Sequence, residues 1–425
     1  MRRLRTRAGE GLRARGRSAA GGAADARDIQ DQLVAWRRHF HENPEVGTET
    51  PETAAYVAGI LTDLGFEVRT GVGGHGVVGV LRGEAAGAAG AGVTFAIRSD
   101  MDALDITEDT GLPFASKRPG KMHACGHDAH MAMALGAATV LSQMRESLAG
   151  NVKIIFQPAE EGPGGAKAMI EDGALEEPKV DAIVGLHIGC LWDVPSGSVG
   201  VMPGPMMAAM DRFEIVVKGK GGHAAMPHQA VDSVVVGSHV VTALQTVVSR
   251  KVSPLAPAVV TVGRFQAGTA HNIIAATAVL EGTARCLNED LRGKMPGYIE
   301  QVAKGVCQGL GADCDVTYYL GYPVVVNDPE FTAFFEGVAR EILGEDRVTR
   351  LSEPTMGGED MAFYLQKVPG TFFFLGSTPS SGQIFPHHNP RFDIDEATLP
   401  VGATLLAETA KRWVEDHAAH AARVR

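Results

Sequence analysis

The stretch Lys121–His130 reads Lys-Met-His-Ala-Cys-Gly-His-Asp-Ala-His and concentrates side chains that can do chemistry. It holds one thiol, three imidazoles and one carboxylate, and Gly126 separates Cys125 from His127. Three chemistries fit such a stretch: a metal site, a cysteine nucleophile with a histidine base, or a redox thiol. The choice among them depends on the partners that the rest of the chain supplies.

Composition and charge exclude several classes of protein. The 425 residues are enough for two ordinary domains, and 45% hydrophobic with 21% charged residues is typical of a soluble globular protein. The net charge of -11 argues against nucleic-acid binding, which needs a concentrated basic face. No uninterrupted apolar run approaches the length of a membrane span. Five scattered cysteines form no disulfide framework and fit a reducing compartment, so we expect a cytoplasmic protein.

The N-terminal segment, residues 1–27, is rich in Arg, Gly and Ala and has almost no large apolar residues. A targeting or nucleic-acid-binding arm is one interpretation, and a disordered extension or an upstream start codon is the other. A secretory signal is not expected, because the segment lacks an apolar core region. We expect a disordered Arg-rich extension and leave it out of the fold prediction.

Three apolar runs, each the length of a buried strand, are followed by polar side chains. Asp100 and Asp102 follow the run Val93–Ile97, Glu160 and Glu161 follow Val152–Phe156, and His187 follows Ala182–Leu186. Open α/β sheets carry their chemistry at the carboxyl ends of their strands, so we expect these side chains to meet at one edge. A long helix, Asp128–Leu148, follows the opening stretch and places His127 at its start.

The middle of the chain has a different pattern of elements. From residue 211 it predicts strand, helix, strand, strand, helix and strand, over 213–218, 231–250, 258–265, 276–286, 291–310 and 314–320. This β-α-β-β-α-β order is that of a ferredoxin-like module, which can fold around its own core. We therefore predict an inserted domain over residues 211–327, and one α/β domain formed by residues 28–210 and 328–425.

The metal interpretation finds partners in several segments. A site with N, S and O ligands needs a thiolate, imidazoles and carboxylates from several strand ends. Five ligands plus water are too many for one tetrahedral ion but suit two ions that share a bridge. Candidates of the right types are Cys125, His127, Glu161, His187 and His388. Each alone has a structural explanation, such as a core histidine or an inert buried thiol, but together they favour a metal centre.

Glu160 and Glu161 are adjacent after a predicted strand, so their side chains should diverge. If one binds metal, the other can face the bound water and take its proton. In the inserted domain, Gly-Lys-Gly-Gly before His223 presents that imidazole on a turn, and Asn272 lies on a second polar turn. Ordinary hairpin chemistry explains both turns equally well.

The chain resembles the M20 metallopeptidase family, and within it the amidohydrolase branch of hippurate hydrolases, N-acyl-amino-acid amidohydrolases and auxin-conjugate hydrolases. The resemblance runs from about Trp36 to the C-terminal helix and leaves out only the N-terminal segment. The matching stretches include RRHFHENPE, SDMDALDI, HACGHDAHMA, QPAEEGPGGAKAMIEDG, GLHIG, GKGGHAAMPH, GGEDMAFY, VPGTFFFLG and HHNPRFDIDE.

This resemblance implies an α/β fold, with a zinc-peptidase-like (aminopeptidase-type) catalytic domain and an inserted ferredoxin-like lid or dimerisation domain. The five candidates above would hold two divalent ions (zinc, manganese, cobalt or nickel), with Cys125 as the bridge and His388 preferred to His387. Glu160 would be the general base, and Asp100 would support the ligands without binding metal. His223 and Asn272 would approach the substrate, with His223 serving the site of a partner subunit in a homodimer or higher homo-oligomer.

The resemblance therefore predicts an enzyme that hydrolyses the amide bond of small N-acyl or N-aroyl amino acids, such as hippurate-like compounds. Metal-bound water would attack the carbonyl with Glu160 as general base, and no nucleic-acid or membrane partner is expected. Three alternatives stay open: a dipeptidase or exopeptidase of the same family, a cysteine hydrolase using Cys125, and a metal-binding protein without catalysis.

Overall fold

The computed structural model describes residues 25–85, 92–379 and 382–424. Most of the segment predicted to be a disordered extension, residues 1–24, lies outside the described residues. The described chain is already packed at Ala26, which is fully buried and donates its backbone N–H to Thr404 Oγ1 at 3.0 Å. The folded part thus begins slightly before the predicted boundary at residue 27. Within the described part, no helix is long and apolar enough to cross a membrane.

An eight-stranded sheet forms the centre of the larger body, with the order β1-β2-β4-β3-β5-β16-β6-β15. Its strands are β1 (Glu67–Val72), β2 (Gly76–Arg82), β3 (Thr94–Asp100), β4 (Asn151–Gln157), β5 (Ala182–Gly189), β6 (Val199–Val201), β15 (Val348–Arg350) and β16 (Gly370–Gly376). The four central strands β4, β3, β5 and β16 are parallel to one another, so their carboxyl ends share one edge.

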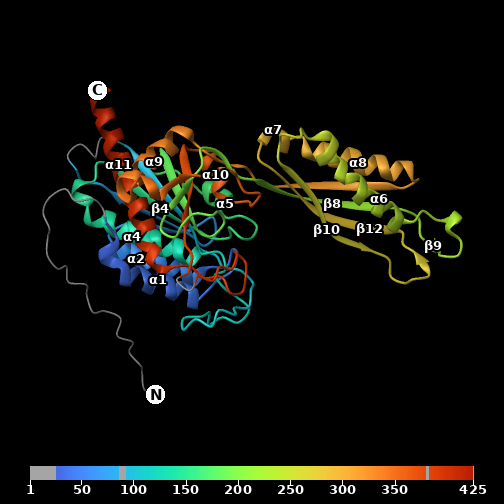
Figure 1. Ribbon diagram of the computed structural model, residues 1–425, viewed down its shortest axis with the longest axis horizontal. Helices are drawn as coiled ribbons and strands as arrows, with labels where there is room; N and C mark the ends of the chain where they lie inside the picture. The colour runs from blue at the N-terminus through green and yellow to red at the C-terminus, as the bar shows by residue number, and fades with distance from the viewer. Residues whose placement is uncertain (1–24, 86–91, 380–381, 425) are drawn as a thin grey trace, which may run out of the picture.

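Helices cover both faces of this sheet (Figure 1). One face carries α1 (Gln30–Glu42), α2 (Pro51–Asp63), α4 (His127–Gln143), α9 (Pro329–Leu343) and α11 (Leu399–Val424), and the other carries α5 (Ala166–Glu171) and α10 (Met361–Leu365). The run Thr-Phe-Phe-Phe-Leu of β16 is buried against both layers of helices. Phe373 packs into the core on the side of α4, and Phe372 and Phe374 pack into the core on the side of α5. Strands buried on both faces consist largely of apolar runs, which is why sequence could locate them.

The second body is a four-stranded antiparallel sheet with the order β10-β12-β8-β13, which Figure 1 shows projecting from the first. Its strands are β8 (Ala209–Lys218), β10 (Ala258–Ala267), β12 (Thr277–Cys286) and β13 (Asp313–Tyr322), and its helices are α6 (Ser233–Thr246), α7 (Glu289–Arg292) and α8 (Met295–Gly309). Phe213, Ile215 and Val217 alternate along β8 into a core shared with α6 and α8. This order and connectivity are those expected of a ferredoxin-like module. We call this body the lid.

Two short ladders complete the fold. β9 (Gly222–His223) pairs with β11 (Ile273–Ile274) in the lid, and β7 (Gly204–Met207) pairs with β14 (Val325–Asn327). Val325 is fully buried in the core of the larger body. The strand β14 therefore belongs with the larger body, and the lid sheet ends at Tyr322, a few residues before the predicted boundary at residue 327.

Candidate metal centre

The stretch Lys121–His130 takes its conformation from a glycine at the start of α4. Gly126 has φ +93°, a left-handed conformation that favours glycine, and a Cβ there would lie 2.7 Å from Ile188 Cγ2. This turn sends the Cys125 thiol and the His127 ring from the helix start toward the strand edge. His187 comes from within β5, two residues before its end, so the strand continues past the His187 at which it was predicted to end.

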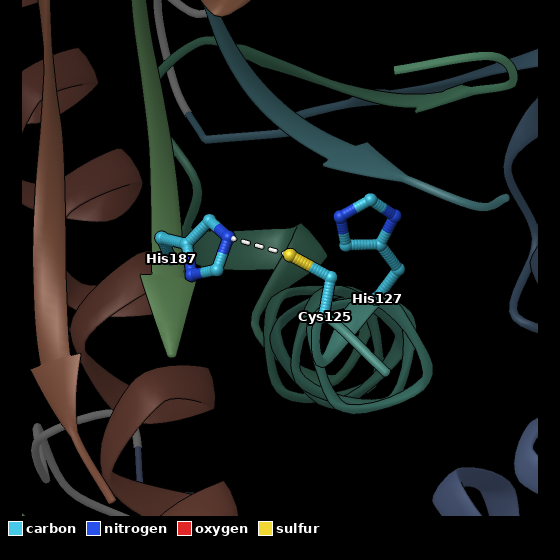
Figure 2. Close-up of side chains that lie close together, drawn as sticks. All are labelled: Cys125, His127 and His187. Carbon is cyan, nitrogen blue, oxygen red and sulfur yellow. Dashed lines mark hydrogen bonds between the residues drawn. The ribbon is translucent and has the colours of Figure 1, made fainter. Parts of the chain in front are cut away.

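Cys125, His127 and His187 form one group, with ligand atoms within 4.8 Å of one another. The Cys125 Sγ lies 3.5 Å from His187 Nε2, and Figure 2 shows the thiol facing that ring, with His127 on its other side. Both rings are oriented through Nδ1: His127 donates to the Asp102 carbonyl at 2.8 Å, and His187 to the Ile188 carbonyl at 2.9 Å. Each ring thereby presents an Nε2 lone pair, the tautomer that a metal ligand needs.

A second group combines Cys125 with Glu161 and His388, again within 4.8 Å. His388 Nε2 lies 3.0 Å from Glu161 Oε1, and the His388 backbone N–H donates to the Ala124 carbonyl at 2.8 Å. The adjacent His387 instead donates from Nε2 to the Ile188 carbonyl at 3.0 Å. Cys125 is thus common to both groups, and His387 is engaged by backbone.

The donor set fits divalent cations. His127 Nε2 is buried without a hydrogen-bond partner among the described residues, although it lies 4.0 Å from both Glu160 and Glu161. A buried, unpaired lone pair costs free energy unless a ligand satisfies it. One thiol, three imidazoles and a carboxylate suit a borderline ion such as zinc, and a shared sulfur suits two ions.

Asp102 fixes the backbone of Glu160 and Glu161. Its Oδ1 accepts from the Glu160 N–H at 2.9 Å and its Oδ2 from the Glu161 N–H at 3.0 Å, while Tyr322 donates to the Glu160 carbonyl at 2.7 Å. The backbone of Glu160 is therefore held from two sides, and that of Glu161 is held by Asp102. Burial, reinforced by the Glu359 and Glu161 carboxylates, raises the pKa of Glu160 well above its usual range.

Behind this loop lies a buried charge cluster around Arg98. Its guanidinium lies 2.8 Å from Asp100, 3.0 Å from Glu359 and 2.6 Å from Asp360. The three buried carboxylates have one guanidinium as their direct partner, and Glu160 lies close to two of them. An excess of buried carboxylate charge is a second reason why bound cations fit here.

His130 holds the Asp100 carboxylate. The His130 Nδ1 donates to Asp100 Oδ1 at 2.7 Å, and its Nε2 accepts from the Ile188 N–H at 3.0 Å. Together these bonds tie β3 to β5 beside His187. The supporting role of Asp100 stays a prediction, and His130 adds two side-chain hydrogen bonds beside the backbone pairing of β3 with β5.

The cysteine-hydrolase alternative finds one supporting and one opposing feature. The contact between Cys125 and His187 has the geometry of a nucleophile with its base. Burial and the nearby Glu161 and Glu160 carboxylates, however, raise the pKa of the Cys125 thiol well above its usual value. Without a bound cation the thiol stays protonated, which disfavours it as a nucleophile.

Comparison with known proteins decides the family. The model of peptidase family M20/M25/M40 matches residues 96–412. The chain belongs to the M20 family. YhaA of Bacillus subtilis (strain 168) is 46% identical over 89% of this chain and 94% of its own length. The N-acetyl-L-cysteine deacetylase of the same organism is 38% identical over 92% and 90%. The crystal structure of the Bacillus subtilis YXEP protein, described as a dinuclear metal binding peptidase of this family, has a TM-score of 0.78 at 36% identity, covering 91% and 99%.

Membership of the M20 family confirms the predicted resemblance and fold class and shows that the chain is an amide-cleaving hydrolase.

A pocket of about 400 Å³ opens over the candidate metal centre and brings in lid residues that sequence did not single out. It is lined by Cys125, Glu160, Glu161, His187 and His388, and also by Arg285, Tyr322 and Glu359. Arg285 is half-buried on β12, donates to the Met356 carbonyl at 3.0 Å, and contacts no carboxylate among the described residues. Burial lowers the pKa of Arg285. Its position on the solvent face of an alternating strand was the only signal available from sequence.

The structure does not bring the two predicted lid residues to this pocket. His223 belongs to β9, which Figure 1 places at the end of the lid farthest from the larger body. Asn272 lies beside it, and its carbonyl accepts from the Ala224 N–H at 3.2 Å. Both residues are therefore close to each other and remote from the metal centre of their own chain.

Proposed function

We propose that this protein hydrolyses N-acyl and N-aroyl amino acids, including hippurate-like compounds, to a carboxylic acid and a free amino acid. The observation that supports this most directly is the content of one pocket. A buried carboxylate, Glu160, lies beside the two ligand groups. Arg285, a guanidinium that pairs with no carboxylate in the part of the chain that the structure describes, lines the same cavity. The activity named for the N-acetyl-L-cysteine deacetylase agrees with it.

In this proposal Cys125, His127 and His187 hold one divalent ion, and Cys125, Glu161 and His388 hold the other. When bound there, divalent ions would supply Lewis acidity for the amide carbonyl and for the water. The donor set is compatible with zinc, manganese, cobalt or nickel. Asp100 and Asp102 keep the ligand loops in place and bind no metal.

Glu160 carries the proton. Its carboxylate accepts a proton from the attacking water, whose oxygen bonds to the carbonyl carbon. When the C–N bond breaks, Glu160 returns that proton to the leaving nitrogen, so the products are an amine and a carboxylic acid, which then releases its own proton to become the carboxylate. The backbone N–H groups of Glu160 and Glu161 donate to Asp102, and this keeps the two side chains in different orientations, one for proton transfer and one for metal binding.

Arg285 orients the substrate by pairing with the carboxylate of the amino-acid half. A guanidinium with no protein carboxylate in contact, in a partly buried site, binds an incoming carboxylate strongly because it gives up no existing ion pair. This contact distinguishes an N-acyl amino acid from a simple amide.

We further propose that the lid mediates a homodimer or higher homo-oligomer and that His223, with Asn272, completes the site of a partner subunit. The remote position of β9 supports this, because the ring cannot reach the pocket of its own chain in this arrangement. Apolar side chains are exposed around it: Met226 is 49% exposed and Ile273 is 54% exposed. Such exposure marks an interaction surface more often than a free one.

A substrate panel on the purified protein tests the function. N-benzoyl, N-acetyl and indole-acetyl amino acids, and dipeptides, are assayed after reconstitution with each of the four metals. Cleavage of acyl amino acids above dipeptides is expected. A preference for dipeptides favours the family's dipeptidase activity, and activity that survives complete chelation favours the cysteine hydrolase. Absence of cleavage by metal-loaded protein favours a metal-binding protein without catalysis.

A further inference from the structure

One row of side chains crosses three strands of the lid sheet beside the candidate metal centre. Met210 on β8 lies opposite Arg285 on β12 and opposite Tyr322 on β13, so the three side chains share one face of the sheet. All three line the pocket of about 400 Å³ over the metal centre. The row therefore places Tyr322 on the same sheet and the same face as Arg285, the residue proposed to bind the substrate carboxylate.

A bulge in β13 turns Tyr322 to this face. The pairing register of β13 with β8 shifts by one residue between Tyr319 and Tyr322. Without the extra residue, Tyr322 would have the orientation of Tyr318, which packs against the lid core. The bulge depends on Gly321, because a Cβ there would lie 2.2 Å from the carbonyl oxygen of Met210. Bulges that redirect a side chain in this way are common beside active sites.

A buried ion pair within the lid holds the bulge in place. Asp211 accepts from the Gly321 N–H at 2.9 Å and from the Tyr318 hydroxyl at 3.0 Å. Arg292 lies 2.8 Å from Asp211 and donates to the Gly321 carbonyl at 2.9 Å. Both backbone groups of Gly321 are thus bound by lid side chains. The backbone of Tyr322, which follows directly, therefore belongs to the lid.

The side chain of Tyr322, in contrast, lies in the larger body. Its hydroxyl donates to the Glu160 carbonyl at 2.7 Å and to the Gly162 carbonyl at 3.0 Å. Its ring packs edge-on against Phe363, with the ring centroids 6.3 Å apart, and a Cβ at Gly164 would lie only 2.8 Å from its Cε1. Tyr322 therefore links the lid sheet to the loop that carries Glu160.

The backbone of this loop is strained next to Glu160. Ala159 has φ +63°, a left-handed conformation that is unfavourable for alanine and persists only where surrounding contacts hold it. Asp102 binds the N–H groups of Glu160 and Glu161 from within the larger body. Tyr322 binds the Glu160 carbonyl from the lid. The peptide groups on both sides of Glu160 are thus fixed, one by each body.

We propose that Tyr322 is a positioning residue through which the lid fixes the general base Glu160. The inference rests on the proposed function, in which Glu160 carries the proton and Arg285 binds the carboxylate. A substrate that pairs with Arg285 holds the row of Arg285, Met210 and Tyr322 over the pocket. The Tyr322 hydroxyl then keeps the Glu160 backbone in the position for proton transfer. A substrate without the carboxylate holds this row less firmly, so Glu160 is positioned less well.

Tyr322→Phe tests the contact, because it removes the hydroxyl and keeps the ring. In metal-loaded protein, kcat for N-acyl amino acids should fall about five- to tenfold, the effect of one hydrogen bond. KM should change by less than about twofold, since the hydroxyl acts in the transition state and binds no substrate. In the wild type, kcat should be higher for an acyl amino acid than for its analogue with the carboxylate converted to an amide. Tyr322→Phe should bring the two values together.

Tyr319→Phe is the matched control, with the same substitution on the same strand. Tyr319 is 45% exposed, and its hydroxyl has no hydrogen bond in the part of the chain that the structure describes. This variant should keep the wild-type kcat and the difference between acid and amide.

An unchanged kcat in Tyr322→Phe, or an equal loss for acid and amide, would overturn the positioning role and leave the proposed function intact. If the wild type cleaves no acyl amino acid, or Glu160→Gln keeps its turnover, the proposed function fails. Hydrogen–deuterium exchange of residues 158–164 in the metal-loaded protein then decides the role of Tyr322. Faster exchange in Tyr322→Phe but not in Tyr319→Phe supports it, and equal exchange in both variants and the wild type excludes it.

Discussion

The Nε2 atom of His388 lies 3.0 Å from Oε1 of Glu161, whereas the ring of the preceding residue, His387, donates to a backbone carbonyl. Two adjacent imidazoles therefore have different surroundings. This contrast favours His388 over His387 as the proposed metal ligand, and it does so more sharply than the sequence motif does.

His388→Ala is expected to lower the metal content of the reconstituted protein from two ions toward one, since it removes a ligand from the group around Glu161. His387→Ala should retain both ions, because its ring is engaged by Ile188. Elemental analysis after gel filtration measures this. Loss of metal in His387→Ala alone would exchange the two assignments.

Glu160→Gln keeps the shape of the side chain and removes its ability to carry a proton. Turnover should fall about 10²- to 10⁴-fold, the range for loss of a general base. Metal content and thermal unfolding should stay close to those of the wild type, because Glu160 is not a proposed ligand. Glu171→Gln, an exposed glutamate on α5, is the control. Near-normal turnover in Glu160→Gln would refute the role.

Arg285→Gln should raise KM for acyl amino acids about tenfold to a hundredfold, which corresponds to about 1.5–3 kcal/mol for a hydrogen bond to a charged group. For the same substrates with the carboxylate converted to an amide, wild type and variant should have the same KM. The comparison is made in steady-state assays at constant salt. A KM increase that persists with the amide would show that the variant disturbs the pocket more generally.

Mixing two inactive variants tests whether His223 acts across subunits. Glu160→Gln and His223→Ala chains, unfolded and refolded together, form mixed dimers in which one of the two sites has neither substitution. Random pairing should restore about a quarter of wild-type activity. Activity that stays at the level of the separate variants would place His223 in its own chain's site or outside catalysis.

His41 should make stability depend on pH. Burial and Arg37 disfavour its charged form, but hydrogen bonds to Asp128 at 2.7 Å and Glu108 at 3.2 Å outweigh them, and the pKa of His41 is raised. A raised pKa in the folded state means that its stabilisation is complete below about 6.5 and is lost as pH rises through the folded pKa. Urea unfolding between pH 6 and 9 should show this decline, and His41→Gln should remove it. His75→Gln, at a more exposed histidine, should keep it.

Sequence determined the sheet and much of the candidate site because those features are local. The apolar runs that became β3, β4 and β5 are buried on both faces, so their composition alone located them. The polar residues near their ends were then expected to converge, because neighbouring parallel strands share an edge. The family resemblance singled out Cys125, Glu160 and His388 by motif.

Tertiary structure decided what depends on contacts between distant segments. The orientation of His127 and His187 depends on hydrogen bonds to backbone carbonyls that no motif encodes. His130 hydrogen-bonds to Asp100 on β3 and to the Ile188 N–H on β5, and both residues lie far from it in sequence. The orientation of Tyr322 was equally hidden, because a bulge at Gly321 sets which way its side chain points. Alternation along β12 is visible in the sequence, but only packing of the lid against the larger body places Arg285 over the metal centre. Spacing along a chain specifies which residues share a face, whereas the pocket that a face encloses depends on the domain that closes it.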